Sequence, residues 1–256
     1  MNQASATVRD ISEVASGVYL IWLEAPDIAT TARPGQFVMV RCGGDVLLRR
    51  PLGVHQVTKS RLALLFSIVG KGTTWLAQRR AGDVLDVLGP LGNSFSIDPA
   101  AKNLLLVAGG IGIAPLCFLG QEAVNNGCSV TLLMGASTGA CLYPGPLLSP
   151  KVGLALTTDD GTTGRKSLVT DLLPEYADWA DQVFACGPLA MYLDMYRRRE
   201  QLLKSKPVQV SLEVRMGCGL GICYGCTVKT RSGLKEVCQD GPVFNLDDVI
   251  WEDVKC

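Results

Sequence analysis

The sequence predicts a multi-domain protein in which an antiparallel β-barrel precedes an α/β domain with a parallel sheet and a small cysteine-rich module. The chain has 256 residues, more than the ~100–150 residues of a typical single domain. Its apolar pattern changes after Pro99, and four of its ten cysteines lie between residues 218 and 238. We therefore expect domains at 1–98, 99–206 and 207–256.

The first domain contains short β-rich runs separated by turn residues. The runs include VYLIWLEA, GQFVMVRC and LALLFSIVG, and the turns include PGQ, GKGT and AGD. This spacing is typical of an antiparallel barrel. The guanidinium of Arg50 in RRPL and the backbone amides of GKGT suit a pyrophosphate. A solvated basic turn and a plain hairpin loop are the alternatives at this point.

In the second domain, apolar runs alternate with helix-compatible stretches, which is typical of a parallel sheet. The segment LLLVAGGIGIAP runs from a buried strand through Gly110, Gly112 and Pro115 into a helix. Small residues there let backbone amides approach an anionic phosphate. Pro115 stands where the common dinucleotide fingerprint has a third glycine, so a plain tight turn stays open as the alternative.

Two more segments lie where strands of the same sheet should end. ACGPLAM places Cys186, Gly187 and Pro188 between a strand and a helix, although a proline-capped helix start would look similar. TTDDG places Asp159 and Asp160 after another strand, where carboxylates accept ribose hydroxyls and repel a 2′-phosphate. This favours NAD over NADP, although the basic pair RK that follows would oppose that preference.

The third domain contains a cysteine pattern with a specific chemical meaning. Cys218, Cys223 and Cys226 have the C-x4-C-x2-C spacing of plant-type ferredoxins, and Cys238 supplies a fourth thiol. Four thiolates hold a [2Fe–2S] cluster, and the glycines between them allow the dihedral angles and close amide approach that such a loop needs. A zinc knuckle or free thiols are the alternatives.

Composition excludes several other classes of protein. The 24 basic and 24 acidic residues balance, so the chain lacks the positive charge of a nucleic-acid binder. No basic segment followed by an apolar one opens the sequence, so we expect a cytoplasmic protein. The apolar run Leu104–Gly120 is short and broken by glycine and proline, so we expect no membrane span.

The other cysteines and the single histidine do not indicate chemistry. Cys42, Cys117, Cys128 and Cys141 lie in or near apolar runs and are expected to pack as small hydrophobic residues. His55 follows the RRPL strand, and hydride transfer between two carriers needs no acid–base residue. We therefore expect a structural or hydrogen-bonding role for His55, and we assign no catalytic residue.

The motifs PGQF, RRPL, GKGT, AGDVLDVLGPLGNSF, GGIGIAP and CGPLAM occur in the order of the ferredoxin–NADP reductase superfamily, which the chain resembles across both domains. The tail SLEVRMGCGLGICYGCTVK with VCQDGPVF resembles the electron-transfer subunits of dihydroorotate dehydrogenase B. The resemblance implies FAD on the barrel and NAD on the α/β domain. Relatives commonly carry serine where Gly53 stands, which puts the tuning of the flavin in doubt. The implied flavin-lining residues are Arg50, Pro51, Leu52, Gly53, Leu65, Phe66, Ser67, Gly72 and Thr73.

The three carriers together indicate a function. NAD exchanges a hydride and a [2Fe–2S] cluster exchanges single electrons, so a flavin must stand between them. The resemblance implies that a separate FMN-containing catalytic subunit oxidises dihydroorotate in pyrimidine biosynthesis, in a heterotetramer with two copies of each subunit. Electrons then pass through the cluster and FAD to NAD⁺.

Two other functions stay open from the sequence. One is an NAD(P)H-dependent flavin and iron–sulfur reductase subunit that serves a hydrogenase, a sulfite reductase or a ferredoxin, because such proteins share the architecture. The other is a zinc-bearing interaction module without enzymatic activity, against which the flavin and dinucleotide motifs argue.

Overall fold

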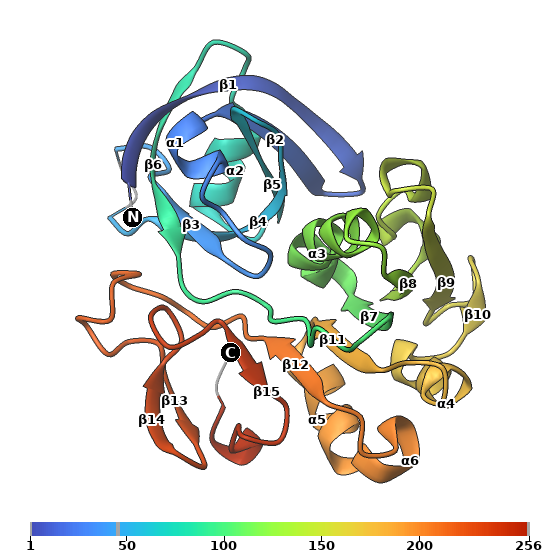
Figure 1. Ribbon diagram of the computed structural model, residues 1–256. Coiled ribbons are helices and arrows are strands. Elements are labelled where there is room, and N and C mark those ends of the chain that lie inside the picture. Colours follow the sequence, from blue (N-terminus) through green and yellow to red (C-terminus); the bar gives the residue numbers. More distant parts are fainter. Residues whose placement is uncertain (1, 45–46, 255–256) are drawn as a thin grey trace.

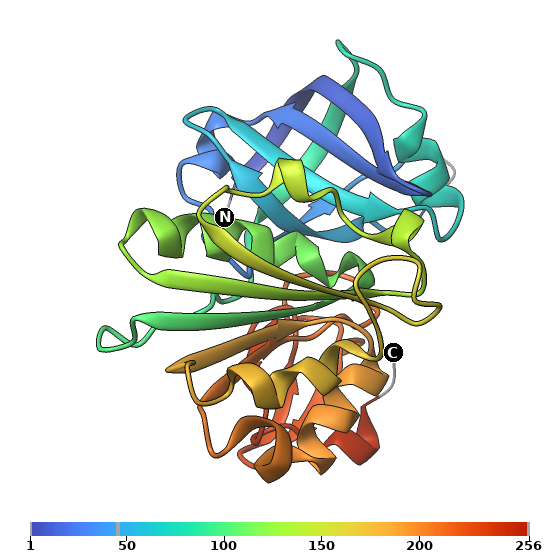
Figure 2. The same ribbon diagram turned by 90° about the vertical axis from the view of Figure 1, so that its right-hand side faces the viewer.

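Three parts follow one another in the computed structural model, which describes residues 2–44 and 47–254 (Figure 1). The barrel lies on one side of a large sheet, and helices α4, α5 and α6 lie on the other (Figure 2). Helix α3 fills the space between the barrel and the sheet (Figure 2). The predicted fold class is therefore confirmed: an antiparallel barrel, a parallel-sheet α/β domain and a small C-terminal module.

The first part is a closed six-stranded barrel with the strand order β1-β2-β5-β4-β3-β6 and antiparallel pairing throughout. Inward and outward residues alternate clearly along β6, as a strand with one buried face requires. Closure pairs every strand edge, so none is left open to solvent. The elements are β1 (Asn2–Ala15), β2 (Val18–Glu24), α1 (Pro26–Ala29), β3 (Phe37–Val40), β4 (Arg50–Val57), β5 (Arg61–Ser67), α2 (Lys71–Ala77) and β6 (Val84–Leu91).

The second part is a seven-stranded sheet with the order β10-β9-β8-β7-β11-β12-β15. All neighbours are parallel except β12 and β15. The elements are β7 (Asn103–Gly109), η1 (Gly110–Gly112), α3 (Ile113–Asn125), β8 (Ser129–Ala136), η2 (Gly139–Cys141), η3 (Gly145–Leu147), β9 (Val152–Thr158), β10 (Arg165–Lys166), η4 (Val169–Leu172), α4 (Leu173–Tyr176), β11 (Gln182–Cys186), α5 (Leu189–Arg197), α6 (Arg199–Leu203) and β12 (Val208–Ser211).

The strand order of this sheet reverses between β7 and β11. The chain leaves β7 toward α3 on the barrel side, whereas it leaves β11 toward α5 on the opposite face (Figure 2). The two connections diverge at the carboxyl ends of adjacent strands. Open α/β sheets bind their ligands at such a switch point, so the topology places a ligand site there.

The third part is built around a hairpin and is tied to the sheet. Its elements are β13 (Thr227–Thr230), β14 (Gly233–Glu236), β15 (Val243–Asn245) and η5 (Trp251–Asp253). β12 and β15 both join the sheet, which therefore extends across the expected boundary between residues 206 and 207. Trp251 is buried and stacks on Tyr192 of α5 with ring centroids 5.2 Å apart. The module is thus packed as part of the α/β core, and its separateness as a domain stays a prediction.

The apolar run that resembles a membrane span divides among three elements. Leu104–Gly120 covers most of β7, the short η1 turn and the first half of α3. Among the described residues, no helix combines the length and the apolar character that crossing a membrane requires.

The four cysteines expected to pack as hydrophobic residues lie inside the fold or at its margin. Cys42 and Cys117 are buried, and burial raises the pKa of each thiol to about 11. Cys128 and Cys141 are half-buried. The packing role is confirmed for Cys42 and Cys117, whereas Cys141 lies beside the cleft described below.

His55 connects the barrel to the α/β domain. It is fully buried on β4, with Nδ1 3.0 Å from the carbonyl oxygen of Ala114 and Nε2 2.9 Å from the hydroxyl of Tyr143. A carbonyl can only accept, so Nδ1 carries the proton and the Tyr143 hydroxyl donates to Nε2. The expected structural role of His55 is confirmed.

This buried histidine predicts a pH dependence of stability. Burial lowers the pKa of His55 to about 4 from the usual 6.5, so between these values the unfolded chain binds a proton that the folded chain does not. Stability should therefore fall as the pH drops below 6.5, by about 2 kcal/mol between pH 7 and pH 5. Denaturant unfolding at several pH values measures this, with His55→Gln as the comparison. Parallel pH curves for the two proteins would contradict the assignment, because His55 is the only histidine in the chain.

Candidate functional site

The four cysteines of the ferredoxin-like pattern lie together beside the hairpin of the third part. The Leu220 amide donates to Cys218 Sγ at 3.3 Å, and the Gly221 amide donates to Cys238 Sγ at 3.1 Å. The Cys238 amide donates to Cys226 Sγ at 3.4 Å. Backbone amides directed at sulfur stabilise thiolates and tune iron–sulfur clusters, so the loop fits a cluster.

The thiols also influence one another's protonation. Burial opposes ionisation of Cys218, but hydrogen bonds from backbone amides, the Leu220 amide first, lower its pKa to about 6. Burial and the neighbouring Cys226 raise the pKa of Cys238 to about 12. Among the described residues, no group of three or more His, Cys, Asp or Glu side chains is arranged to hold a single metal ion.

Glycines let this cysteine loop lie directly on the barrel. Gly219 and Gly221 both have φ of +72°, a conformation that favours glycine. A Cβ on Gly219 would lie 2.7 Å from Met39 Cγ on β3. Cβ atoms on Gly217 and Gly225 would lie 3.2 and 3.5 Å from Cys223 Sγ. The sequence therefore keeps the loop backbone close both to the sulfur and to the barrel.

On the barrel, the two predicted anion-binding elements are adjacent. A Cβ on Gly72 would lie 2.8 Å from Nε of Arg50, so the arginine side chain crosses the start of α2. The Thr73 hydroxyl accepts hydrogen bonds from the amides of Val69 and Gly70 at 2.9 and 3.2 Å. Thr73 thus stabilises the GKGT loop, and Arg50 supplies positive charge beside it.

The other predicted flavin residues divide according to strand alternation. Phe66 points into the barrel core and stacks on Tyr19 with centroids 5.9 Å apart, so its side chain is not available to a ligand. Leu65 points the opposite way, toward the α/β domain, and is also buried. The half-buried residues at the surface are Pro51, Leu52, Gly53 and Ser67.

One turn connects the barrel surface to the switch point of the sheet. A Cβ on Gly53 would lie 3.9 Å from Pro115 Cδ, so β4 faces the start of α3. Gly112 lies three residues before Pro115 in the same turn, and a Cβ on it would lie 2.0 Å from the carbonyl oxygen of Cys186. Only glycine permits that approach of η1 to the end of β11. The Gly110–Pro115 turn therefore contacts both the barrel surface and the CGP motif.

A cleft of about 470 Å³ opens at the carboxyl ends of the central strands. It brings together four predicted residues, Gly110, Asp159, Gly187 and Pro188. Cys186 lies beneath them and is buried, and its burial raises its pKa well above the ordinary value. The sequence segments GGIGIAP, TTDDG and CGPLAM therefore meet at one site, as the sheet topology requires.

The two aspartates of TTDDG have different positions. Asp159 lines the cleft, whereas Asp160 accepts hydrogen bonds from the amide and hydroxyl of Thr162 at 2.9 and 2.7 Å. These bonds lower the pKa of Asp160 and hold the turn. Arg165 of the RK pair forms an ion pair with Glu175, which partly neutralises its charge.

Three residues of the cleft were missed by reasoning from sequence. Glu213 follows β12 and is exposed as a residue. Cys186 Sγ donates to its carboxylate at 3.9 Å, and the protein that surrounds this carboxyl raises its pKa by desolvation. The hydroxyls of Thr157 and Thr170 are buried and have no hydrogen-bond partner within the described structure. Thr157 belongs to TTDDG and Glu213 to SLEVRMGCGLGICYGCTVK, but neither motif assigns these residues to the cleft. Only the sheet topology brings them there together with Thr170.

Comparisons with known proteins agree with this arrangement. The profile of the iron–sulfur cluster binding domain of dihydroorotate dehydrogenase B matches residues 213–250. A dihydroorotate dehydrogenase B (NAD(+)) electron transfer subunit from Desulforamulus reducens is 41% identical over 96% of this chain and 98% of its own. The subunit of the same name from Geobacillus sp. is 37% identical over 98% of this chain and 99% of its own.

Solved structures show the same fold. The structure of an NADH-dependent reduced ferredoxin-NADP oxidoreductase, reported for flavin-based electron bifurcation, aligns with a TM-score of 0.89 and 31% identity over 97% of this chain and 91% of its own. A ferredoxin reductase of carbazole 1,9a-dioxygenase aligns with a TM-score of 0.70 over 82% of this chain and 68% of its own. At 18% identity, the second likeness concerns the fold alone.

Fold and site together define an electron-transfer oxidoreductase subunit with the ferredoxin–NADP reductase fold and an iron–sulfur domain. Within that class, the chain belongs to the family of dihydroorotate dehydrogenase B electron transfer subunits. The cofactors are FAD and a [2Fe–2S] cluster, and NAD is the substrate of the family. The geometry fits these groups: amides directed at clustered sulfurs, an arginine across the α2 start, and a cleft at the switch point.

The contact between Gly219 and Met39 predicts the effect of one added methyl group. Gly219→Ala should reduce iron and labile sulfide content severalfold, because the new Cβ would meet Met39 and an L-residue at positive φ costs roughly 1–2 kcal/mol. Iron analysis and the visible absorption spectrum measure this loss. Gly233→Ala is the control, because Gly233 also has positive φ but nothing within 4 Å. Equal losses in both variants would show that backbone strain alone matters and that the Met39 contact does not.

Proposed function

We propose that this chain passes electrons from an FMN-containing dihydroorotate dehydrogenase catalytic subunit to NAD⁺, through its [2Fe–2S] cluster and FAD, in pyrimidine biosynthesis. Full-length relatives carrying this subunit name support the proposal. The observation that carries it is the Gly110–Pro115 turn, which contacts the CGP motif at Gly112 and the barrel surface at Pro115. One short segment thus adjoins both the cleft and the flavin-side strand.

The residues of the barrel and the cleft have distinct roles in this proposal. Arg50 and the GKGT loop hold the flavin pyrophosphate, with Gly72 giving room for the guanidinium. Gly110, Gly187 and Pro188 line the path of the dinucleotide. When bound, the flavin supplies exchange of both hydride and single electrons. The cleft residues orient the dinucleotide toward Gly53. Because glycine has no side chain, the backbone of β4 is accessible at that position.

The four cysteine thiolates are the proposed cluster ligands, and the amides of Leu220 and Gly221 stabilise the charge on two of them. Cys223 is the exposed member of the set. On either side of it, Ile222 is 70% and Tyr224 is 69% exposed. Large apolar side chains displayed beside a one-electron carrier suit the core of a protein interface. We place the catalytic subunit on this face, in a heterotetramer with two copies of each subunit.

A related function has one supporting observation. The NADH-dependent reduced ferredoxin-NADP oxidoreductase structure covers 97% of this chain at 31% identity. A reductase subunit serving a ferredoxin or another enzyme is therefore the second candidate. Purification with the native partner separates the two: an FMN protein that oxidises dihydroorotate supports the first, and a nickel or sirohaem protein supports the second.

The different positions of Asp159 and Asp160 predict the basis of nucleotide choice. NADH should reduce the flavin much faster than NADPH, because a 2′-phosphate near Asp159 would meet an uncompensated carboxylate. Asp159→Asn should lower the ratio of the NADH rate to the NADPH rate by about tenfold. Asp160→Asn is the matched control, because its amide oxygen can still accept from Thr162 and it stands outside the cleft. Stopped-flow flavin reduction with each nucleotide gives the ratios, and equal parental rates would refute the assignment.

The route of electrons has its own test in Cys223→Ser. This variant should lose the cluster absorption bands but keep FAD and the oxidation of NADH by an artificial two-electron acceptor, because the barrel motifs lie elsewhere. Electron transfer between dihydroorotate and NAD⁺ should fall to background.

Complex formation must be measured alongside that rate, because loss of a cluster can unfold the loop and prevent docking. A variant that still binds the catalytic subunit, lacks the cluster and transfers electrons at the parental rate would disprove the proposed order of carriers. Ile222→Ser is the companion variant, which should weaken docking and leave the cluster bands intact.

A further inference from the structure

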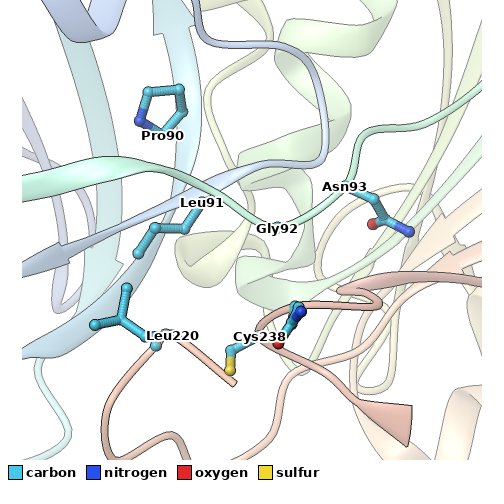
Figure 3. A pocket seen from close by; sticks show the side chains of 8 residues that line it. Pro90, Leu91, Gly92, Asn93, Leu220 and Cys238 are labelled. Atoms are coloured by element: carbon cyan, nitrogen blue, oxygen red, sulfur yellow. The ribbon is translucent and has the colours of Figure 1, made fainter. Parts of the chain in front are cut away.

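The linker between the barrel and the sheet passes directly over the end of the cysteine loop. A pocket of about 320 Å³ separates them, and on one side it is lined by Pro90 and Leu91 at the end of β6 and by Gly92 and Asn93 of the linker (Figure 3). The opposite side is formed by Gly219, Leu220, Cys238 and Gln239 (Figure 3). A proposed cluster ligand, Cys238, therefore faces the chain that leaves the barrel.

Asn93 hydrogen-bonds to the segment that follows this ligand through both side-chain atoms, Nδ2 and Oδ1, and through its backbone amide. Its Nδ2 donates to the carbonyl oxygens of Asp240 and Val243, both at 2.8 Å. Its Oδ1 accepts from the amide of Val243 at 2.9 Å, and its own amide donates to the Gly241 carbonyl at 2.6 Å. Asn93 thus binds both ends and the middle of residues 240–243.

The linker also approaches this segment more closely than a side chain would allow. A Cβ on Gly92 would lie 2.6 Å from Pro242 Cδ and 2.7 Å from the Gly241 carbonyl oxygen. Gly92 has φ of +73°, so both the space and the backbone conformation favour glycine. The Gly92–Asn93 pair therefore fixes residues 240–243 against the end of the barrel.

The sulfur of Cys238 is fixed from the other side as well. The Gly221 amide donates to it at 3.1 Å, and the same loop lies on Met39 through Gly219. Cys238 is two residues from the segment that Asn93 holds. We propose that Asn93 is a positioning residue that sets the place of Cys238, and hence of the cluster, relative to the barrel. This inference rests on the assignment of Cys238 as a cluster ligand, and it does not depend on the identity of the partner.

Hydrogen bonds to cluster sulfurs and the exposure of the cluster set its electronic properties. If Asn93 sets the geometry at Cys238, its loss should change the cluster while leaving hydride transfer at the cleft unaltered. If Asn93 only fastened the linker to the protein, its loss would not change the cluster selectively while hydride transfer stayed the same. Gln209 supplies the comparison, because its side chain hydrogen-bonds to the amide and carbonyl of Ser96 on the same linker and makes no hydrogen bond to residues 240–243 within the described structure.

The experiment compares Asn93→Ala, Asn93→Asp and Gln209→Ala with the parent, each as the full chain loaded with FAD and cluster. The readouts are the EPR spectrum of the reduced cluster, the rate of iron release to a chelator, and flavin reduction by NADH. Asn93→Ala removes three side-chain hydrogen bonds. We expect it to shift the EPR g-values and to release iron at least about tenfold faster, a change equal to the net contribution of roughly one hydrogen bond. Flavin reduction should keep the parental rate, and Gln209→Ala should match the parent in all three.

Asn93→Asp keeps the size of the side chain and the acceptor for Val243, so it tests the proposal even if the alanine variant does not fold. Its carboxylate would face two carbonyl oxygens, so the EPR spectrum should change here too. Parental spectra and iron release in both Asn93 variants, or the same changes in Gln209→Ala, would overturn the inference. Cys238→Ala tests the underlying assignment separately, because alanine has no atom that can bind iron and a cluster retained in that variant would remove Cys238 from the ligand set.

Discussion

The contact between Gly112 and the Cys186 carbonyl is the constraint on which the arrangement of sites depends. A methyl group at residue 112 would lie 2.0 Å from that oxygen, so η1 can reach the end of β11 only without a side chain. Helix α3, which packs between the sheet and the barrel, begins directly after this contact. Pro115 then faces Gly53, and the buried His55 binds the carbonyl of Ala114 on the same turn. One glycine thereby positions the cleft at the switch point and a barrel surface with respect to each other.

A second constraint comes from the pairing of β3 with β4 in the barrel. Met39 pairs with Pro51, and Phe37 pairs with Gly53. On β3, the side chain of Met39 lies beneath Gly219 of the cysteine loop. On β4, Pro51 and Gly53 belong to the proposed flavin surface. A single pair of hydrogen-bonded strands therefore connects the barrel residue beneath the cysteine loop to the proposed flavin surface, and Gly219 lets the loop approach that strand pair closely.

The parts of this fold that sequence predicts well are those encoded locally. Turn residues mark the barrel strands, and the cysteine spacing is a direct consequence of how four thiolates surround a cluster. Long-range pairing is not encoded in that way, so the sequence does not predict that β12 joins β11 across the expected boundary or that β15 then joins β12. Glu213 and Asn93 lie within motifs of the sequence, but those motifs assign them no role, because their partners are distant along the chain. Side-chain direction was the other limit: Phe66 points into the barrel although its strand borders the predicted site.

The antiparallel β15 also changes how the cysteine module must be understood. Cys226 and Cys238 flank the β13–β14 hairpin, and the chain then enters the sheet within five residues of Cys238. Residues 240–243 are bound by Asn93 at the barrel end and continue into β15, which completes the sheet beside β12. The module therefore contacts both the barrel and the sheet. Because the segment after the last cysteine continues directly into the edge strand β15, binding of the cluster should stabilise the α/β domain as well as the loop.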